Sequence, residues 1–206
     1  MDIFAHRIVP LVVINDHEDA HPLGEALVAA GLPIAEVSFR TEAAAESVAI
    51  MSEIEGLTVG AGTIVTAAQV ELAVEAGADF LVSPGLRSDI VREAQLAGRR
   101  MIPGAVTPGE LMAALALGID TVKFFPANLY GGPAAIEALA GPFNTMKFLP
   151  MGGISPENLG EYLSLECVPA VCGSWMVPTE LIEARDFEAI YQLCLEAVDM
   201  VASAQN

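Results

Sequence analysis

Two consecutive copies of one pattern occupy residues 66–105, TAAQVELAVEAGADFLVSPGLRSDIVREAQLAGRRMIPGA. Each copy begins with Thr or Ser before a stretch rich in Ala, Leu and Glu, continues to a glycine (Gly77 or Gly98) and ends in a short apolar run. A hydroxyl residue is a good helix N-cap, and a glycine directly after a helix takes the left-handed conformation that ends it. The stretch therefore predicts two helix–strand units in succession.

The same spacing extends along the whole chain, with glycines of this kind at positions 31, 56, 77, 98, 118 and 141. Eight apolar runs accompany them: Ile8–Ile14, Ala35–Phe39, Leu57–Val59, Phe80–Val82, Arg100–Pro103, Thr121–Phe125, Lys147–Leu149 and Pro169–Cys172. The runs are nearly continuous instead of alternating, which is typical of strands buried on both faces of a parallel sheet.

Helix start signals lie between the runs, at Thr41, Thr66, Ser88, Thr107 and Ser155, and Pro178-Thr179-Glu180 predicts a last helix running toward Ala202. Eight strand–helix units predict an α/β fold of the compact (β/α)8 TIM barrel type, as a single domain over residues 1–206. A doubly wound sheet is the alternative, but it rarely keeps so even a period through eight strands.

The composition of the chain limits the kinds of molecule that it can bind. Hydrophobic residues make up 53% and charged residues 17%, which excludes intrinsic disorder. The net charge of −18 opposes general binding to nucleic acid or to anionic membranes, so an anionic ligand must be held by local donors. No apolar run approaches 18 residues, no signal peptide is evident at the start, and three cysteines are too few for a disulfide framework. We expect a cytoplasmic protein with no nucleic-acid or membrane partner.

Lys123 is the residue that packing does not explain, because it interrupts the apolar run Thr-Val-Lys-Phe-Phe-Pro. A buried ammonium costs several kcal/mol unless it is paired or neutralised. Desolvation favours the neutral amine, which can attack a carbonyl carbon. The alternative is a lysine that reaches out at the strand end or pairs with an acid. Lys147, at the start of its run, is expected to be a surface residue.

Glu36, Ser38 and Arg40 share one side of their strand, because side chains in a strand repeat with a period of two. A buried Glu36 near Lys123 is either a counter-ion or a general base. Arg40 has the planar guanidinium that suits a carboxylate, or is a solvated charge at the rim. Thr63 is a hydroxyl donor at a strand end or a plain turn residue.

Gly152, Gly153 and Ser174 follow the seventh and eighth strands, where barrels often bind phosphate through backbone N–H groups and a helix terminus. The alternative is that these glycines only form tight turns. The three histidines show no ligand partners at useful spacing, so we expect no metal site.

Several motifs in sequence order resemble the bacterial 2-keto-3-deoxy-6-phosphogluconate (KDPG) aldolases, which are often also active on 4-hydroxy-2-oxoglutarate (KHG). The motifs are Glu36-Val-Ser-Phe-Arg40-Thr, Gly-Ala-Gly-Thr63, Ser-Pro84-Gly, Lys123-Phe-Phe125-Pro-Ala, Gly152-Gly153-Ile-Ser-Pro and Gly173-Ser174-Trp. The resemblance runs from about Ile8 to the C-terminal helix. Departures from the family pattern stand at Ser38, Asn128, Met151 and Cys172.

The resemblance implies a role for each matching residue. Lys123 would form the Schiff base and Glu36 would be the acid/base. Arg40 and Thr63 would hold the substrate carboxylate, Pro84 and Phe125 would line the pocket, and Gly152, Gly153 and Ser174 would bind phosphate. It implies a metal-independent class I aldolase, without a cofactor, that acts on a phosphorylated 2-keto acid and assembles as a homotrimer.

Two other functions fit a barrel of this size. A phosphosugar isomerase or epimerase would need a metal cluster or two opposed acids, and the sequence offers neither. A phosphate-binding barrel without activity would not need Lys123 inside a strand.

Overall fold

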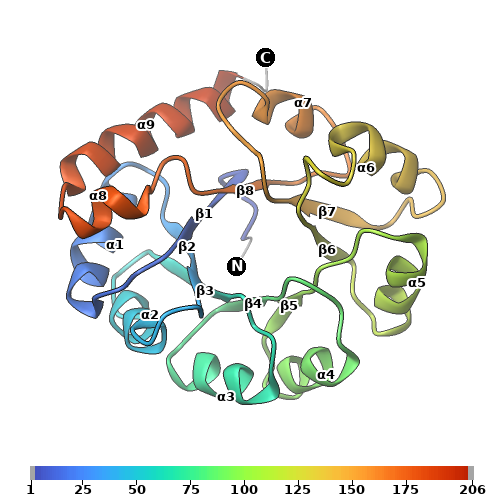
Figure 1. Cartoon of the computed structure of the whole chain (residues 1–206), viewed down its shortest axis with the longest axis horizontal. Helices are drawn as coiled ribbons and strands as arrows, with labels where there is room; N and C mark the ends of the chain where they lie inside the picture. The colour runs from blue at the N-terminus through green and yellow to red at the C-terminus, as the bar shows by residue number, and fades with distance from the viewer. Residues whose placement is uncertain (1–2, 204–206) are drawn as a thin grey trace.

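The computed structural model describes residues 3–203, which form a ring of strands with helices on its outer side (Figure 1). The strands are β1 Ile8–Val12, β2 Ile34–Ser38, β3 Thr58–Gly62, β4 Phe80–Val82, β5 Arg100–Ile102, β6 Thr121–Phe124, β7 Lys147–Pro150 and β8 Val171–Gly173. The helices are a short 3-10 helix His17–Asp19, α1 Ala20–Ala29, α2 Ala44–Ser52, α3 Ala67–Glu75, α4 Ser88–Leu96, α5 Pro108–Ala116, α6 Gly132–Ala140, α7 Leu159–Leu163, α8 Thr179–Glu183 and α9 Phe187–Ser203.

All strand pairs are parallel. Six strands form one curled sheet in the order β5-β4-β3-β2-β1-β8, and β6 and β7 form a second pair. Single bridges, Gly104–Lys123 and Met151–Cys172, lie between the two sheets. Prolines stand at these junctions, Pro103 directly after β5 and Pro150 at the end of β7, and a proline has no N–H to extend a ladder. The predicted parallel α/β fold is thus confirmed, with its ladder divided into six strands and two.

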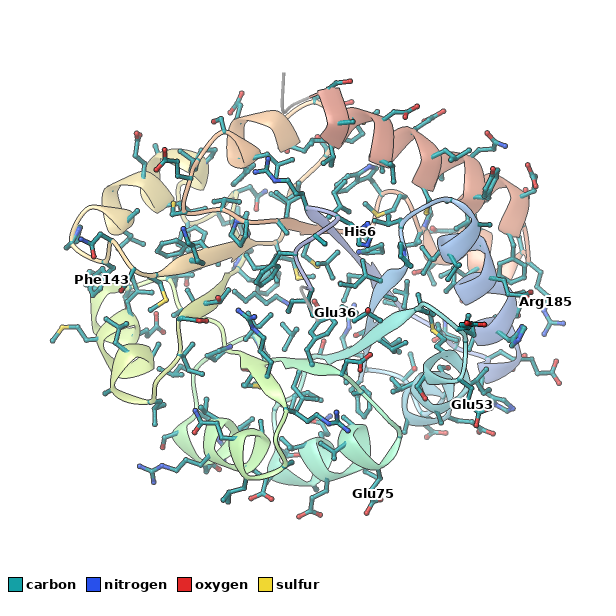
Figure 2. All side chains as sticks on the ribbon, turned by 180° about the vertical axis from the view of Figure 1, so that it is seen from behind. His6, Glu36, Glu53, Glu75, Phe143 and Arg185 are labelled. Atoms are coloured by element: carbon teal, nitrogen blue, oxygen red, sulfur yellow. The ribbon has the colours of Figure 1, made fainter. Side chains whose placement is uncertain are left out.

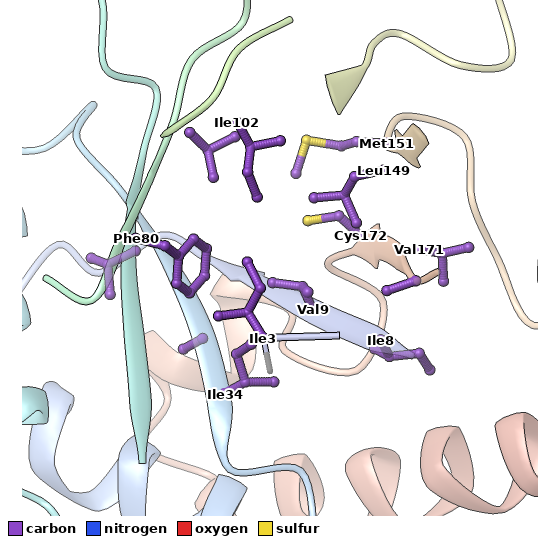
Figure 3. Close-up of a cluster of buried hydrophobic side chains, with 14 of the residues drawn as sticks. Ile3, Ile8, Val9, Ile34, Phe80, Ile102, Leu149, Met151, Val171 and Cys172 are labelled. Carbon is purple, nitrogen blue, oxygen red and sulfur yellow. The ribbon is translucent and has the colours of Figure 1, made fainter. Parts of the chain in front are cut away.

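The interior of the ring is apolar at the end where the strands begin. Figure 3 shows Val9, Ile34 and Phe80 grouped around Ile3, which comes from the segment before β1. The Arg7 side chain donates hydrogen bonds to the carbonyls of Leu163, Val168 and Pro169. Residues 3–7 therefore cover this end of the ring and leave the carboxyl ends of the strands for the site.

Two of the predicted helix starts have full capping boxes. The Thr66 hydroxyl accepts from the backbone N–H of Gln69, and the Thr107 hydroxyl accepts from that of Glu110. In return, the Gln69 and Glu110 side chains accept from the backbone N–H of the two threonines. Such reciprocal bonds satisfy N–H groups that the first helical turn leaves unpaired. The predicted caps at Thr66 and Thr107 are confirmed.

The prediction of one last helix from Pro178 toward Ala202 is wrong, because two helices, α8 and α9, occupy this region. Arg185 lies between them in the left-handed conformation, at φ 54°. Its side chain forms ion pairs with Asp16, Glu18 and Asp19, which follow β1. The break in the helix thus lets one arginine bind three acids from the other end of the chain. No helix in residues 3–203 is both long and apolar enough to cross a membrane.

Close backbone packing at Gly104 gives a test of this ring. A Cβ at Gly104 would overlap the backbone carbonyl of Pro84, whereas a Cβ at Gly109 in α5 would meet nothing within 4 Å. We expect Gly104→Ala to lower the free energy of unfolding by about 1–3 kcal/mol, the usual effect of overpacking. Gly109→Ala should leave it unchanged or raise it by up to about 1 kcal/mol. Urea unfolding followed by circular dichroism measures both, and equal effects of the two variants would contradict the packing described here.

Candidate active site

A buried ion pair lies inside the ring. Lys123 on β6 places its Nζ 3.4 Å from Oε1 of Glu36 on β2. The Lys123 residue is 4% exposed and Glu36 is fully buried, and the Glu36 side chain is labelled inside the ring in Figure 2. The two residues are 87 positions apart in the sequence. The fold therefore brings an amine and a carboxylate together out of contact with water.

The second carboxylate oxygen of Glu36 also has a partner. The Cys172 thiol on β8 donates to Oε2 of Glu36, with the sulfur 3.5 Å from the oxygen. Burial, together with the nearby charge of Glu36, raises the pKa of the Cys172 thiol well above its ordinary value. Cys172 is thus held as a protonated donor and not as a thiolate nucleophile.

Space for the Glu36 carboxylate comes from a glycine on the neighbouring strand. Gly62 pairs with Ser38 in the parallel register of β2 and β3. A Cβ at Gly62 would overlap the Glu36 carboxylate. The glycine-rich end of β3 therefore provides volume for the acid.

Three polar side chains form a chain at the carboxyl ends of β2 and β3. Arg40 Nε donates to Ser38 Oγ at 2.7 Å, and Ser38 Oγ lies 3.2 Å from Thr63 Oγ1. Ser38 is buried, Thr63 is half-buried and Arg40 is exposed. Thr63 has a φ of 61°, which is uncommon for a β-branched residue. The structure thus joins Arg40 and Thr63 through Ser38.

A cavity of about 140 Å³ lies between the ends of β7 and β8. Its lining includes Phe125, Gly152, Gly153, Cys172 and Ser174. Lys123 Nζ lies 5.3 Å from the centre of the Phe125 ring. Because Cys172 also contacts Glu36, this cavity adjoins the buried ion pair.

The loop after β7 contains two backbone donors without an acceptor in residues 3–203. Gly152 and Gly153 have φ angles of 93° and 73°, which only glycine adopts readily. Their carbonyls accept from the Asn128 N–H and the Asn158 side chain. No acceptor within residues 3–203 takes the N–H of either glycine, and these donors are available to a ligand.

Eight of the nine predicted site residues fall into three groups. Lys123 and Glu36 form the ion pair, Arg40 and Thr63 are joined through Ser38, and Phe125, Gly152, Gly153 and Ser174 line the cavity. Pro84 is exposed and does not line that cavity; its carbonyl packs against Gly104, which bridges to Lys123.

Sequence reasoning noted Cys172 only as a departure from the family pattern and missed its contact with the site. The structure shows a fully buried thiol that donates to the Glu36 carboxylate. The local sequence held no signal for this contact, because a cysteine in a strand ordinarily only packs. Within the described residues, no three His, Cys, Asp or Glu side chains are grouped so that they could hold a metal ion.

The fold and the site together define a class of protein, the enzymes that form an imine between a lysine and a carbonyl substrate. An amine buried beside a carboxylate, at the carboxyl ends of parallel strands, is the arrangement with which enzymes form imines with carbonyl substrates.

Comparison with known proteins identifies the family. The sequence model of the KDPG and KHG aldolase family matches residues 2–193. The KHG/KDPG aldolase of Escherichia coli K12 is 42% identical over 193 residues, which are 93% of this chain and 91% of that protein. The chain belongs to the KDPG and KHG aldolase family and is an aldolase, a carbon–carbon lyase.

Solved structures agree with this assignment. The KDPG aldolase of Zymomonas mobilis ZM4, solved with 3-phosphoglycerate, has a TM-score of 0.89 and 40% identity, covering 96% of this chain and 95% of that one. The KDPG aldolase of Legionella pneumophila, solved with pyruvate as a covalent carbinolamine, has a TM-score of 0.90 and 39% identity, covering 94% and 95%.

The space above Gly62 gives a test of the site. Gly62→Ala should displace the Glu36 carboxylate and reduce aldolase kcat by about 10²-fold, the effect of a misplacement of about 1 Å. Gly85→Ala is the matched control, because a Cβ there would meet nothing within 4 Å. Steady-state release of pyruvate measures both variants. Normal turnover by a folded Gly62→Ala protein would show that the position of Glu36 does not matter.

Proposed function

We propose that this chain is a class I aldolase that cleaves KDPG to pyruvate and glyceraldehyde 3-phosphate. We propose that it also cleaves 4-hydroxy-2-oxoglutarate to pyruvate and glyoxylate. The observation that carries the proposal is the buried Lys123 amine, 3.4 Å from the Glu36 carboxylate. The names of the relatives support both substrates, since they include KHG/KDPG aldolase and 2-dehydro-3-deoxy-phosphogluconate aldolase.

In the proposed reaction, Lys123 is the nucleophile. Glu36 accepts the ammonium proton across the short contact between them, and the free amine adds to the C2 ketone. Glu36 then returns this proton to the hydroxyl of the carbinolamine, which leaves as water and gives a protonated imine. The positive nitrogen then withdraws the electron pair of the C3–C4 bond, which is the role a metal has in other aldolases, so no step requires a metal or an organic cofactor.

Glu36 is the proposed acid/base. It takes the proton of the C4 hydroxyl, directly or through a water, while the C3–C4 bond breaks and the aldehyde leaves. The remaining enamine is protonated at C3, and addition of water to the imine releases pyruvate and the Lys123 amine. Burial of Glu36 next to Lys123 supports this role, because the carboxylate and the reacting nitrogen are in contact.

Arg40 and Thr63 are the proposed ligands of the substrate carboxylate. A guanidinium donates two parallel N–H groups that match two carboxylate oxygens. Phe125 is the proposed wall beside the reacting carbon, supported by its ring lying next to Lys123 Nζ. Pro84 is proposed as a second wall, held by the contact of its backbone with Gly104.

Gly152, Gly153 and Ser174 are the proposed phosphate ligands. Support comes from the two glycine N–H groups that no acceptor in residues 3–203 takes, and from the cavity that all three residues line. Uncharged donors of this kind allow a chain with a net charge of −18 to bind an anion locally.

We infer that the eight strands close into one (β/α)8 barrel and that residues 1–206 are one domain. The bridges Gly104–Lys123 and Met151–Cys172 support closure, because they lie at both gaps between the two sheets. Residues 1–2 and 204–206 lie outside the described part of the chain.

We further propose a cytoplasmic homotrimer without a nucleic-acid or membrane partner. Exposed apolar side chains on three successive helices support contact between copies: Leu72 on α3, Leu96 on α4, and Met112 and Leu115 on α5.

Reductive trapping tests the lysine. With pyruvate and borohydride, we expect a stable adduct on Lys123, located by mass spectrometry of peptides. Lys123→Met should abolish the adduct and turnover, because no other amine lies beside Glu36 among the described residues. Lys147→Met is the matched control, since Lys147 is exposed at the start of β7 and should be dispensable. An adduct on Lys147, or full activity of Lys123→Met, would exclude the proposed mechanism.

Comparison of two substrates tests the phosphate loops. Ser174→Ala should lower kcat/KM for KDPG by about 10-fold or more, because a hydrogen bond to a charged group contributes about 1.5–3 kcal/mol. Cleavage of 4-hydroxy-2-oxoglutarate, which has no phosphate and a shorter chain, should fall less. Equal losses on both substrates would place the phosphate elsewhere.

A further inference from the structure

The chain Arg40–Ser38–Thr63 contains a residue to which the reaction scheme assigns no role. Ser38 is the last residue of β2 and is fully buried, yet its hydroxyl touches both of the side chains proposed to bind the substrate carboxylate. A buried hydroxyl with two polar partners is constrained, because each of its hydrogen-bonding positions must be matched.

The chemistry of the three groups fixes the direction of the chain. A guanidinium only donates, so Ser38 Oγ is the acceptor of the 2.7 Å bond from Arg40 Nε. The Ser38 hydrogen then has one partner among the described residues, Thr63 Oγ1 at 3.2 Å. If Thr63 donated instead, the Ser38 hydrogen would be buried without an acceptor, which costs about 1–3 kcal/mol. Arg40 therefore donates to Ser38, and Ser38 donates to Thr63.

This direction determines what Thr63 can offer. Its oxygen accepts from Ser38, so its own hydrogen is free of any acceptor in residues 3–203. The terminal nitrogens of Arg40 are free of hydrogen-bond acceptors in the same part of the chain. A carboxylate accepts hydrogen bonds and cannot donate them. Both ends of the chain thus present donors, which is the pattern that a carboxylate requires.

We propose that Ser38 is a positioning residue that orients Arg40 and Thr63 as a pair of donors for the carboxylate of the 2-keto acid. This inference rests on the proposed function, in which Arg40 and Thr63 hold that carboxylate. Ser38 selects substrates with a carboxylate next to the ketone over simple ketones. Without its hydroxyl, the Thr63 hydroxyl turns freely and Arg40 Nε loses its anchor, while Lys123 and Glu36 keep their own contact.

The experiment compares two ketones in borohydride trapping on Lys123. Pyruvate carries the carboxylate, and acetone, of similar size, does not. In Ser38→Ala we expect the half-saturating concentration of pyruvate to rise about 10-fold, which corresponds to the loss of about 1.4 kcal/mol of binding. Trapping by acetone should be unchanged. Ser38→Thr keeps the hydroxyl and should restore the saturation by pyruvate.

A matched control is Ser47→Ala, which removes an equally buried hydroxyl from the outer helix α2 and should alter neither ketone. Equal weakening of pyruvate and acetone in Ser38→Ala, or a Ser38→Thr protein that behaves like Ser38→Ala, would overturn the role of the hydroxyl. If Ser38→Ala left the half-saturating concentration of pyruvate unchanged while Arg40→Ala raised it, the role of Ser38 would be overturned and that of Arg40 would stand. Failure of pyruvate to label Lys123 in the unmodified chain would instead overturn the proposed function.

Discussion

The contact between Lys123 and Glu36 is the constraint on which the rest of the interior depends. Removal of an ammonium and a carboxylate from water costs several kcal/mol for each ion, and neither is stable there without the other. Other side chains in the ring of strands offset the rest of this desolvation cost. The Cys172 thiol on β8 occupies the second oxygen of Glu36, and the Phe125 ring lies beside the lysine nitrogen. Side chains from β8 and from the end of β6 therefore stabilise the same pair of charges.

Glycines on β3 make this arrangement possible within a small ring. A Cβ at Gly60 would overlap the Phe80 ring, and one at Gly62 would overlap the Glu36 carboxylate. Strand β3 thus fills little of the interior itself. The space beside it is occupied by one side chain from β4 and one from β2. The phenyl group of Phe80 lies toward the end of the strand ring that residues 3–7 cover. The Glu36 carboxylate lies farther along the strands, in the floor of the site.

The period of the glycines predicted the eight strands, because each helix–strand unit has local signals of its own. Lys123 was recognisable for a similar reason: a charged residue inside an apolar run needs an explanation wherever the strand lies. The contact of Cys172 with Glu36 was not predictable, since it joins residues 136 positions apart and a cysteine in a strand ordinarily only packs. The break at Arg185 likewise depends on acids near the other end of the chain. Local sequence patterns predict helices and strands, whereas these contacts between distant residues exist only in the assembled ring.

Pairing between β1 and β8 has a consequence for how the protein is made. Ile8 lies beside Val171 in this pairing, and Arg7 bonds the carbonyl of Val168. A nascent chain emerges from its N-terminus, so β1 waits for its second neighbour until nearly the whole polypeptide has been synthesised. The last strand also carries Cys172 and precedes Ser174. A polypeptide truncated before residue 170 would hold its lysine and its glutamate but leave one edge of β1 open to pairing with other nascent chains.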